Sequence, residues 1–139
     1  MIVLIPAYKP GNSLIRLIHQ LTAHSESIQV LVIDDGSGSE YTPIFTELTL
    51  TGATVITHPV NLGKGAAIRT GLNWARIYQP RQVVVTADAD GQHLVRDILR
   101  VGARTATHAD SGKHSLVLGV RTLPDNTAQG SGTVPVRSK

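Results

Sequence analysis

Short apolar runs that alternate with amphipathic stretches constrain the fold of this chain more than any other feature. Apolar runs cover residues 2–5, 30–33, 83–85 and 116–120, and each is too short for a helix. Residues 14–21, 64–78 and 95–102 repeat apolar side chains at helical spacing, and a weaker helix and a short strand are expected at 42–48 and 53–57. Apolar strands separated by helices predict an α/β fold, with a doubly wound, mostly parallel sheet and helices on both faces.

Composition excludes several classes of protein. No stretch approaches the roughly 20 apolar residues that cross a bilayer, and Pro6 ends an apolar opening that no basic residue precedes, so neither a membrane span nor a secretory signal is predicted. The absence of cysteine excludes disulfides and thiolate sites and fits a cytoplasmic protein. The net charge of +3 is scattered, so no nucleic-acid partner is expected.

The alternation of strands and helices continues only to about residue 122. Residues 1–122 are therefore expected to form one domain, and residues 123–139, which are rich in turn-forming residues and lack periodicity, predict a flexible loop or tail.

An acidic turn follows the apolar run at 83–85. Asp88 and Asp90 flank Ala89, and Gln92 follows two positions later. Mg²⁺ and Mn²⁺ prefer oxygen ligands and commonly also hold substrate phosphates, so these side chains are candidate metal ligands. The alternative is that one carboxylate caps the following helix and the other is solvated. The position at the end of a strand favours the metal site, because ligands of parallel sheets bind beyond the carboxyl ends of the strands.

Two other strand ends carry polar residues. Asp34 and Asp35 follow the second apolar run, where one carboxylate suits the hydroxyls or a base N–H of a nucleotide; the alternative is a capping or turn role. Pro6, Ala7 and Tyr8 end the first run, where Tyr8 either lies against a base or is a packing aromatic.

The loop at 61–67 places two glycines and a lysine at the start of a helix. Its backbone N–H groups and Lys64 are suited to a phosphate, and the alternative is a turn whose glycines allow close packing. The spacing does not match a Walker A loop, and no G-x-G-x-x-G follows the first strand, so an ATPase and a dinucleotide oxidoreductase are disfavoured. The six histidines lack metal-ligand spacing and are expected at the surface or in packing, except His93 beside the acidic turn.

Taken together, these segments resemble family-2 glycosyltransferases of the GT-A fold. The resemblance lies, in the family's order, in residues 5–8, 32–37, 61–71, 87–93 with 97–98, and 118–121. The segments at 61–65 and 87–93 resemble the branch of dolichyl-phosphate and polyprenyl-phosphate mannosyl- and glucosyltransferases.

The resemblance implies roles for particular residues. Pro6, Ala7, Tyr8 and Asp35 would line a nucleoside pocket that Asp34 supports, and Gly63, Lys64 and Ala89 would also contact the nucleotide sugar. Asp88, Asp90 and Gln92 would hold Mg²⁺ or Mn²⁺ against the donor diphosphate. Arg121, with Asp88 and Asp90, would belong to the catalytic set, and Arg137 and Ser138 would face an acceptor phosphate.

The implied reaction is transfer of a sugar, with inversion, from a UDP- or GDP-sugar to a polyprenyl or dolichyl phosphate or to a glycan. No general base is evident, and an anionic phosphate acceptor needs none. Family members continue well beyond this length and often carry membrane-associated helices. The chain is therefore expected to be a C-terminally truncated donor half, from a protein at the cytoplasmic face of the membrane, that binds a nucleotide sugar but turns it over poorly.

Two alternatives remain at this stage. A sugar-phosphate nucleotidylyltransferase would need a glycine-rich segment after the first strand, which residues 6–10 do not supply. A nucleotide-sugar-binding module without turnover would retain the same pocket.

Overall fold

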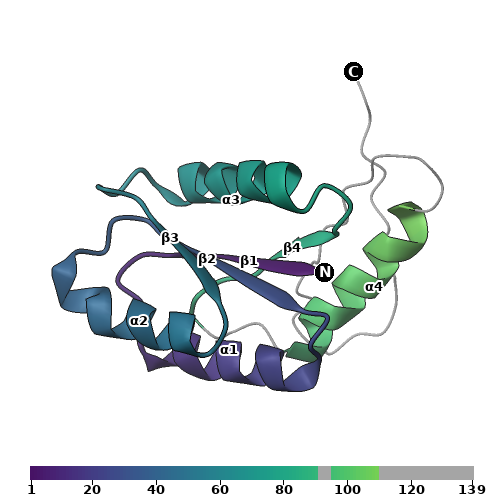
Figure 1. Cartoon of the computed structure of the whole chain (residues 1–139), viewed down its shortest axis with the longest axis horizontal. Helices are drawn as coiled ribbons and strands as arrows, with labels where there is room; N and C mark the ends of the chain where they lie inside the picture. Colours follow the sequence, from purple (N-terminus) through teal and green to yellow (C-terminus); the bar gives the residue numbers. More distant parts are fainter. Residues whose placement is uncertain (91–94, 110–139) are drawn as a thin grey trace, which may run out of the picture.

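The computed structural model describes residues 1–90 and 95–109, with side chains up to residue 104 (Figure 1). The strands are β1 (Ile2–Ala7), β2 (Gln29–Asp34), β3 (Thr54–Thr57) and β4 (Val84–Thr86). The helices are α1 (Asn12–His24), a 3-10 turn (Ser39–Tyr41), α2 (Thr42–Leu50), α3 (Lys64–Tyr78) and α4 (Val95–Ala109). The predicted alternation of strands and helices is confirmed for these residues, whereas the predicted strand at 116–120 lies outside them.

The described strands form one parallel sheet in the order β3-β2-β1-β4. β2 and β3 thus follow β1 on one side, and the chain then crosses back so that β4 pairs with β1 on the other side. This reversal of strand order between β1 and β4 is a topological switch point, where loops leave in opposite directions and a crevice forms.

Pro6 explains why the sheet opens at this point. The backbone groups of Ile2 and Leu4 bond to β4, through Ile2 N to Val83 O and Ala87 N to Leu4 O. Because backbone groups alternate between the two neighbours of a parallel strand, Pro6 is the next residue turned towards β4, and it has no N–H to donate. The pairing of β1 with β4 therefore stops at Leu4, while the pairing with β2 continues to Ala7.

Helices cover both faces of the sheet, as Figure 1 shows, with α3 on one side and α1, α2 and α4 on the other. The period-two alternation of β1 sends Val3, Ile5 and Ala7 into the larger core, and Ile2 and Leu4 into the smaller core beneath α3. The larger core is completed mainly by the α1 stripe and by residues of α2 and α4 (Leu14, Leu17, Ile18, Leu21, Phe45, Leu48 and Ile98).

Small residues let α3 approach the sheet closely. Ala67, Gly71 and Ala75 form its buried face, one turn apart along the helix. A Cβ atom at Gly71 would lie 2.2 Å from Leu4 Cδ1, so glycine is needed there for the helix to pack on β1. This packing holds the N-terminal end of α3 at the carboxyl end of the sheet.

The start of α1 lies close to the loop after β4. Gly11 is the N-cap, and no side chain caps the helix. Ser13 places its hydroxyl 3.5 Å from the carbonyl oxygen of Ala89, across the switch point.

Within the described residues, no helix is both long and apolar enough to cross a membrane.

Candidate nucleotide-sugar site

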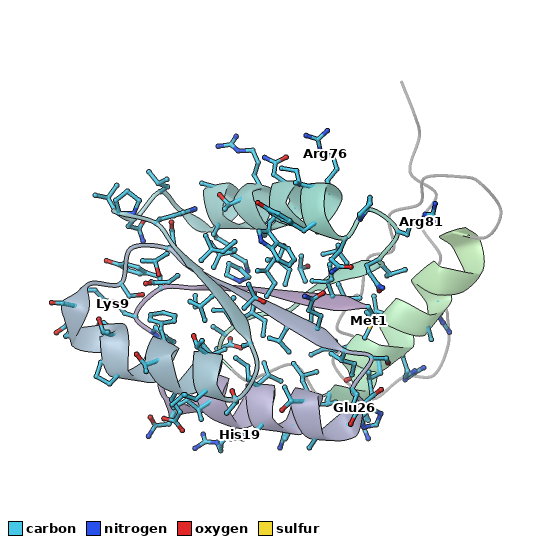
Figure 2. All side chains as sticks on the ribbon, in the orientation of Figure 1. Met1, Lys9, His19, Glu26, Arg76 and Arg81 are labelled. Atoms are coloured by element: carbon cyan, nitrogen blue, oxygen red, sulfur yellow. The ribbon has the colours of Figure 1, made fainter. Side chains whose placement is uncertain are left out.

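A cleft of about 610 Å³ lies at the switch point between the carboxyl ends of β1 and β4. In Figure 2, Lys9 marks this end of the molecule and Met1 the opposite end. The cleft is lined by Pro6, Ala7, Tyr8, Lys9, Pro10, Gly11, Ser13, Asp35, Asn61, Gly63, Lys64, Asp88, Ala89 and Asp90. Its size and mixed lining suit a small polar ligand with an apolar part.

The segment after β1 is held in a sharp turn. Lys9 adopts a left-handed conformation, with φ of 49°, and its backbone N–H donates to Ser37 Oγ at 2.9 Å. The buried Ser37 in turn donates its own N–H to Asp34 Oδ1 at 2.9 Å. Tyr8 is 51% exposed at the mouth of the cleft, and Lys9 Nζ lies 5.5 Å from its ring centroid. An exposed aromatic ring here offers a flat surface to a base.

Asp34 and Asp35 have different roles in the folded chain. Asp34 is buried, caps the turn at Ser37 and does not line the cleft, so its place is underneath the predicted nucleoside pocket. Asp35 lines the cleft and accepts hydrogen bonds from the N–H groups of Leu62 at 3.0 Å and Gly63 at 2.7 Å. The Asp35 carboxylate thereby ties the turn after β2 to the loop that precedes α3.

A buried histidine completes the surroundings of Asp35. His58 Nδ1 lies 2.7 Å from Asp35 Oδ1, and the two side chains are 9% and 4% exposed. Burial alone would raise the pKa of Asp35, but the hydrogen bonds from Leu62, His58 and Gly63, with the charge of His58, hold that pKa below its usual value. Asp35 is therefore an anion that the protein has already stabilised.

Lys64, the first residue of α3, reaches across the cleft. Its Nζ lies 2.5 Å from Asp88 Oδ1, and the two side chains are 62% and 43% exposed. This ion pair joins the loop at 61–67, which is predicted to contact phosphate, to the acidic turn, which is predicted to hold a metal. Gly63 precedes it as the N-cap with φ of 91°, and no side chain caps the helix, so its first N–H groups are suited to an anion.

Two carboxylates of the cleft are candidate ligands for a divalent metal. Asp88 and Asp90 both line the cleft and supply carboxylate oxygens, the ligands that Mg²⁺ and Mn²⁺ prefer. Among the side chains that the structure describes, no group of three or more histidine, cysteine or acidic residues could hold a metal. Two carboxylates still fit a cation such as Mg²⁺, which usually takes its other ligands from water and substrate phosphates.

The cleft brings together most of the residues predicted from the sequence. These are Pro6, Ala7, Tyr8, Asp35, Gly63, Lys64, Asp88, Ala89 and Asp90. Asp34 is described but does not line the cleft. The other candidates lie outside the described residues: Gln92, His93, Arg121, Arg137 and Ser138. Sequence reasoning missed His58, which it treated with the other histidines as a surface or packing residue. His58 directly follows β3, and Asp35 directly follows the neighbouring strand β2.

A parallel sheet with helices on both faces, and a switch-point cleft lined by carboxylates and lysines, is consistent with an α/β domain of the GT-A type. The chain matches the glycosyl transferase family 2 over residues 2–125, and it belongs to that family.

Three relatives illustrate the family membership. An uncharacterized protein of Methanocaldococcus jannaschii is 31% identical over 99 residues, covering 71% of this chain and 39% of that protein. Polyprenol monophosphomannose synthase of Mycolicibacterium smegmatis is 28% identical over 131 residues, covering 92% and 47%. UDP-N-acetylglucosamine–dolichyl-phosphate N-acetylglucosaminyltransferase of Methanococcus voltae is 31% identical over 114 residues, covering 71% and 44%. The chain thus spans less than half the length of each relative. No solved structure matches it.

Proposed function

We propose that this chain is the donor-binding part of a metal-dependent glycosyltransferase that transfers a sugar from a nucleoside-diphosphate donor to a polyprenyl or dolichyl phosphate. The observation that carries the proposal is the convergence of Asp88, Asp90 and Lys64 in one cleft of a family-2 chain. Both named relatives support the acceptor class, because their names specify polyprenol monophosphomannose and dolichyl phosphate.

The charges in the cleft explain why the donor needs a cation. The described lining of the cleft holds three carboxylates, Asp35, Asp88 and Asp90, and two lysines, Lys9 and Lys64, so a bound diphosphate adds to a net negative charge. A divalent cation held by Asp88 and Asp90 offsets both carboxylates and attracts the phosphates. When bound, Mg²⁺ or Mn²⁺ supplies Lewis-acid stabilisation of the charge that develops on the leaving diphosphate.

The rest of the cleft suits a nucleoside. Pro6, Ala7 and Tyr8 form one wall, on which the exposed ring of Tyr8 can stack with a base. Asp35 Oδ1 already accepts two hydrogen bonds, whereas Oδ2 accepts one, which leaves acceptor capacity for a hydroxyl or N–H of the nucleoside. In this arrangement the nucleoside contacts Asp35 at the end of β2, and the phosphates lie nearer Lys64 and β4.

The proposed transfer is a single displacement with inversion. An oxygen of the acceptor phosphate forms a bond to the anomeric carbon as the bond from that carbon to the diphosphate breaks. The nucleoside diphosphate leaves with the bonding electron pair. Since the attacking phosphate is already an anion, no side chain has to remove a proton from it.

Calorimetric titration of the chain with UDP- and GDP-sugars, with and without Mn²⁺, tests donor binding. Metal-dependent binding of one of them is the expected result, and the absence of binding to either overturns the proposal. A transfer assay with a polyprenyl phosphate then separates an active transferase from a module that only binds the donor. Release of pyrophosphate from a nucleoside triphosphate and a sugar phosphate would instead indicate a nucleotidylyltransferase.

A further inference from the structure

His58 occupies a buried position between three elements of the site. It follows β3 directly, its backbone N–H donates to Asp34 O at 2.8 Å, and only 8% of the residue is exposed. One ring nitrogen, Nδ1, lies 2.7 Å from Asp35 Oδ1, and the other, Nε2, lies 2.9 Å from Thr70 Oγ1 on α3. The imidazole therefore bridges the end of β2 to the body of α3, with both nitrogens satisfied.

The contacts of His58 continue to the phosphate side of the cleft. Asp35, which His58 contacts, also accepts the N–H groups of Leu62 and Gly63. Gly63 is the N-cap of α3, and Lys64 follows it with its Nζ on Asp88. A continuous series of hydrogen bonds and adjacent residues thus runs from Thr70 through His58 and Asp35 to the ammonium group of Lys64, which contacts the acidic turn.

The loop that donates these hydrogen bonds is also confined from the other side. A Cβ atom at Gly36 would lie 2.3 Å from the carbonyl carbon of Val60 and 2.5 Å from the amide nitrogen of Asn61, so the turn after β2 packs directly against the loop. Leu62 is 57% exposed, so burial of its side chain contributes little to holding the loop. The carbonyl oxygen of Gly63 accepts the N–H groups of Ala66 and Ala67, whereas the amide groups of Leu62 and Gly63 are restrained by their hydrogen bonds to Asp35.

We infer that His58 is a positioning residue for the donor diphosphate, acting through Asp35 on the loop at 61–64. This inference rests on the proposed function. His58 does not line the cleft, and its contribution is to fix the Asp35 carboxylate so that the amides of Leu62 and Gly63, and with them Lys64, are held at the phosphate end. Fixing these groups before the donor arrives reduces the ordering cost of binding.

Three substitutions separate this role from simple packing. His58→Leu removes both hydrogen bonds of the ring. His58→Asn keeps an amide N–H near the position of Nδ1, so it retains the bond to Asp35 and loses the bond to Thr70. Leu48→Val is the matched control, because Leu48 is fully buried in the layer beneath the opposite face of the sheet and has no contact with the cleft.

Two measurements on the purified chain test the inference. Amide hydrogen exchange of Leu62 and Gly63, followed by NMR, reports the loop directly, and the dissociation constant of UDP or GDP with Mn²⁺ reports the site. His58→Leu is expected to speed exchange at both amides at least about tenfold and to weaken nucleotide binding by about tenfold or more, equivalent to about 1.4 kcal/mol. His58→Asn should give smaller changes in both. Leu48→Val should leave both within about twofold.

The outcomes distinguish the inference from the proposed function. If folded His58→Leu keeps wild-type exchange at Leu62 and Gly63, or wild-type nucleotide affinity, His58 does not position the loop. If Leu48→Val weakens binding as much as His58→Leu, the effect is one of general stability and the inference is wrong. If the wild-type chain binds neither nucleotide, the proposed function fails, and the positioning of the loop is decided by the exchange rates alone.

Discussion

Replacing Asp88 by Asn separates the contribution of this carboxylate to ligand binding from its contribution to stability. The side chain is 43% exposed, and its ion-pair partner Lys64 is 62% exposed. Ion pairs between solvent-exposed side chains contribute about 0.2–1 kcal/mol, and solvent screening places this pair at the lower end. Asp88→Asn is therefore expected to lower the free energy of unfolding by less than about 1 kcal/mol, as measured by urea denaturation.

The effect on metal-dependent donor binding should be much larger. Loss of even an indirect, hydrogen-bonding partner of a metal ligand typically costs about 10- to 100-fold in metal affinity. Loss of a ligand carboxylate is expected to cost at least about 100-fold, or about 2.7 kcal/mol. Titration of Mn²⁺ in the presence of UDP or GDP, followed by electron paramagnetic resonance of the free ion, measures this change.

Asp97→Asn is the matched control. Asp97 is 51% exposed, lies in the first turn of α4, and its Oδ1 is 3.8 Å from Arg96 Nε. It is not among the residues described as lining the cleft, so the same change of charge occurs there at similar exposure. It should leave Mn²⁺ affinity unchanged. Wild-type affinity in Asp88→Asn, or an equal loss in both variants, would refute the assignment of Asp88 as a metal ligand. A loss of stability well above 1 kcal/mol would instead show that the carboxylate is mainly structural.

Three further predictions concern the backbone and the buried carboxylate. Gly36→Ala combines a left-handed φ of 70° with a backbone clash, and should lower unfolding free energy by about 2–4 kcal/mol and weaken nucleotide binding. Gly71→Ala should cost about 1–3 kcal/mol in urea denaturation, whereas Gly65→Ala, with open space in the same helix, should gain about 0.5–1 kcal/mol; equal effects would contradict the packing argument. The pKa of Asp35 is lowered in the folded chain, so the ionised carboxylate stabilises the fold. This stabilisation should be complete above the ordinary pKa of 3.8 and should be lost as the pH falls through the folded-state pKa. The difference in unfolding free energy between wild type and Asp35→Asn should therefore shrink below pH about 4. A difference in unfolding free energy that stays constant across this pH range would contradict the lowered pKa of Asp35.

Most of the fold follows from local pattern, and β1 shows where pattern is insufficient. Pro6 predicts the end of the first strand at Ile5, yet β1 continues to Ala7. The missing N–H of Pro6 faces β4, with which pairing has already ended, so the ladder with β2 is unaffected. Which neighbour a strand residue faces depends on the order of strands in the sheet, and that order is a property of the whole chain.

The cleft was largely predictable because the carboxyl ends of parallel strands share one edge of the sheet. His58 was not, because its role depends on register. β2 and β3 pair with Asp34 opposite Thr57, which places His58 beside Asp35. The apolar pattern of residues 53–57 is too short to set this register. The contact of His58 with Thr70, which lies twelve positions further along the chain on α3, has no local sequence signal at all.

The two acidic pairs show how spacing determines what a pair of carboxylates can do. Asp34 and Asp35 are adjacent, and adjacent side chains at a strand end point to opposite sides, so one caps the turn at Ser37 and the other faces the cleft. Asp88 and Asp90 are two positions apart, and both line the cleft. Only the second spacing places both carboxylates of a pair in the cleft. The adjacent pair divides into a structural anion and a ligand-facing one, which is why the metal is proposed at β4 and the nucleoside at β2.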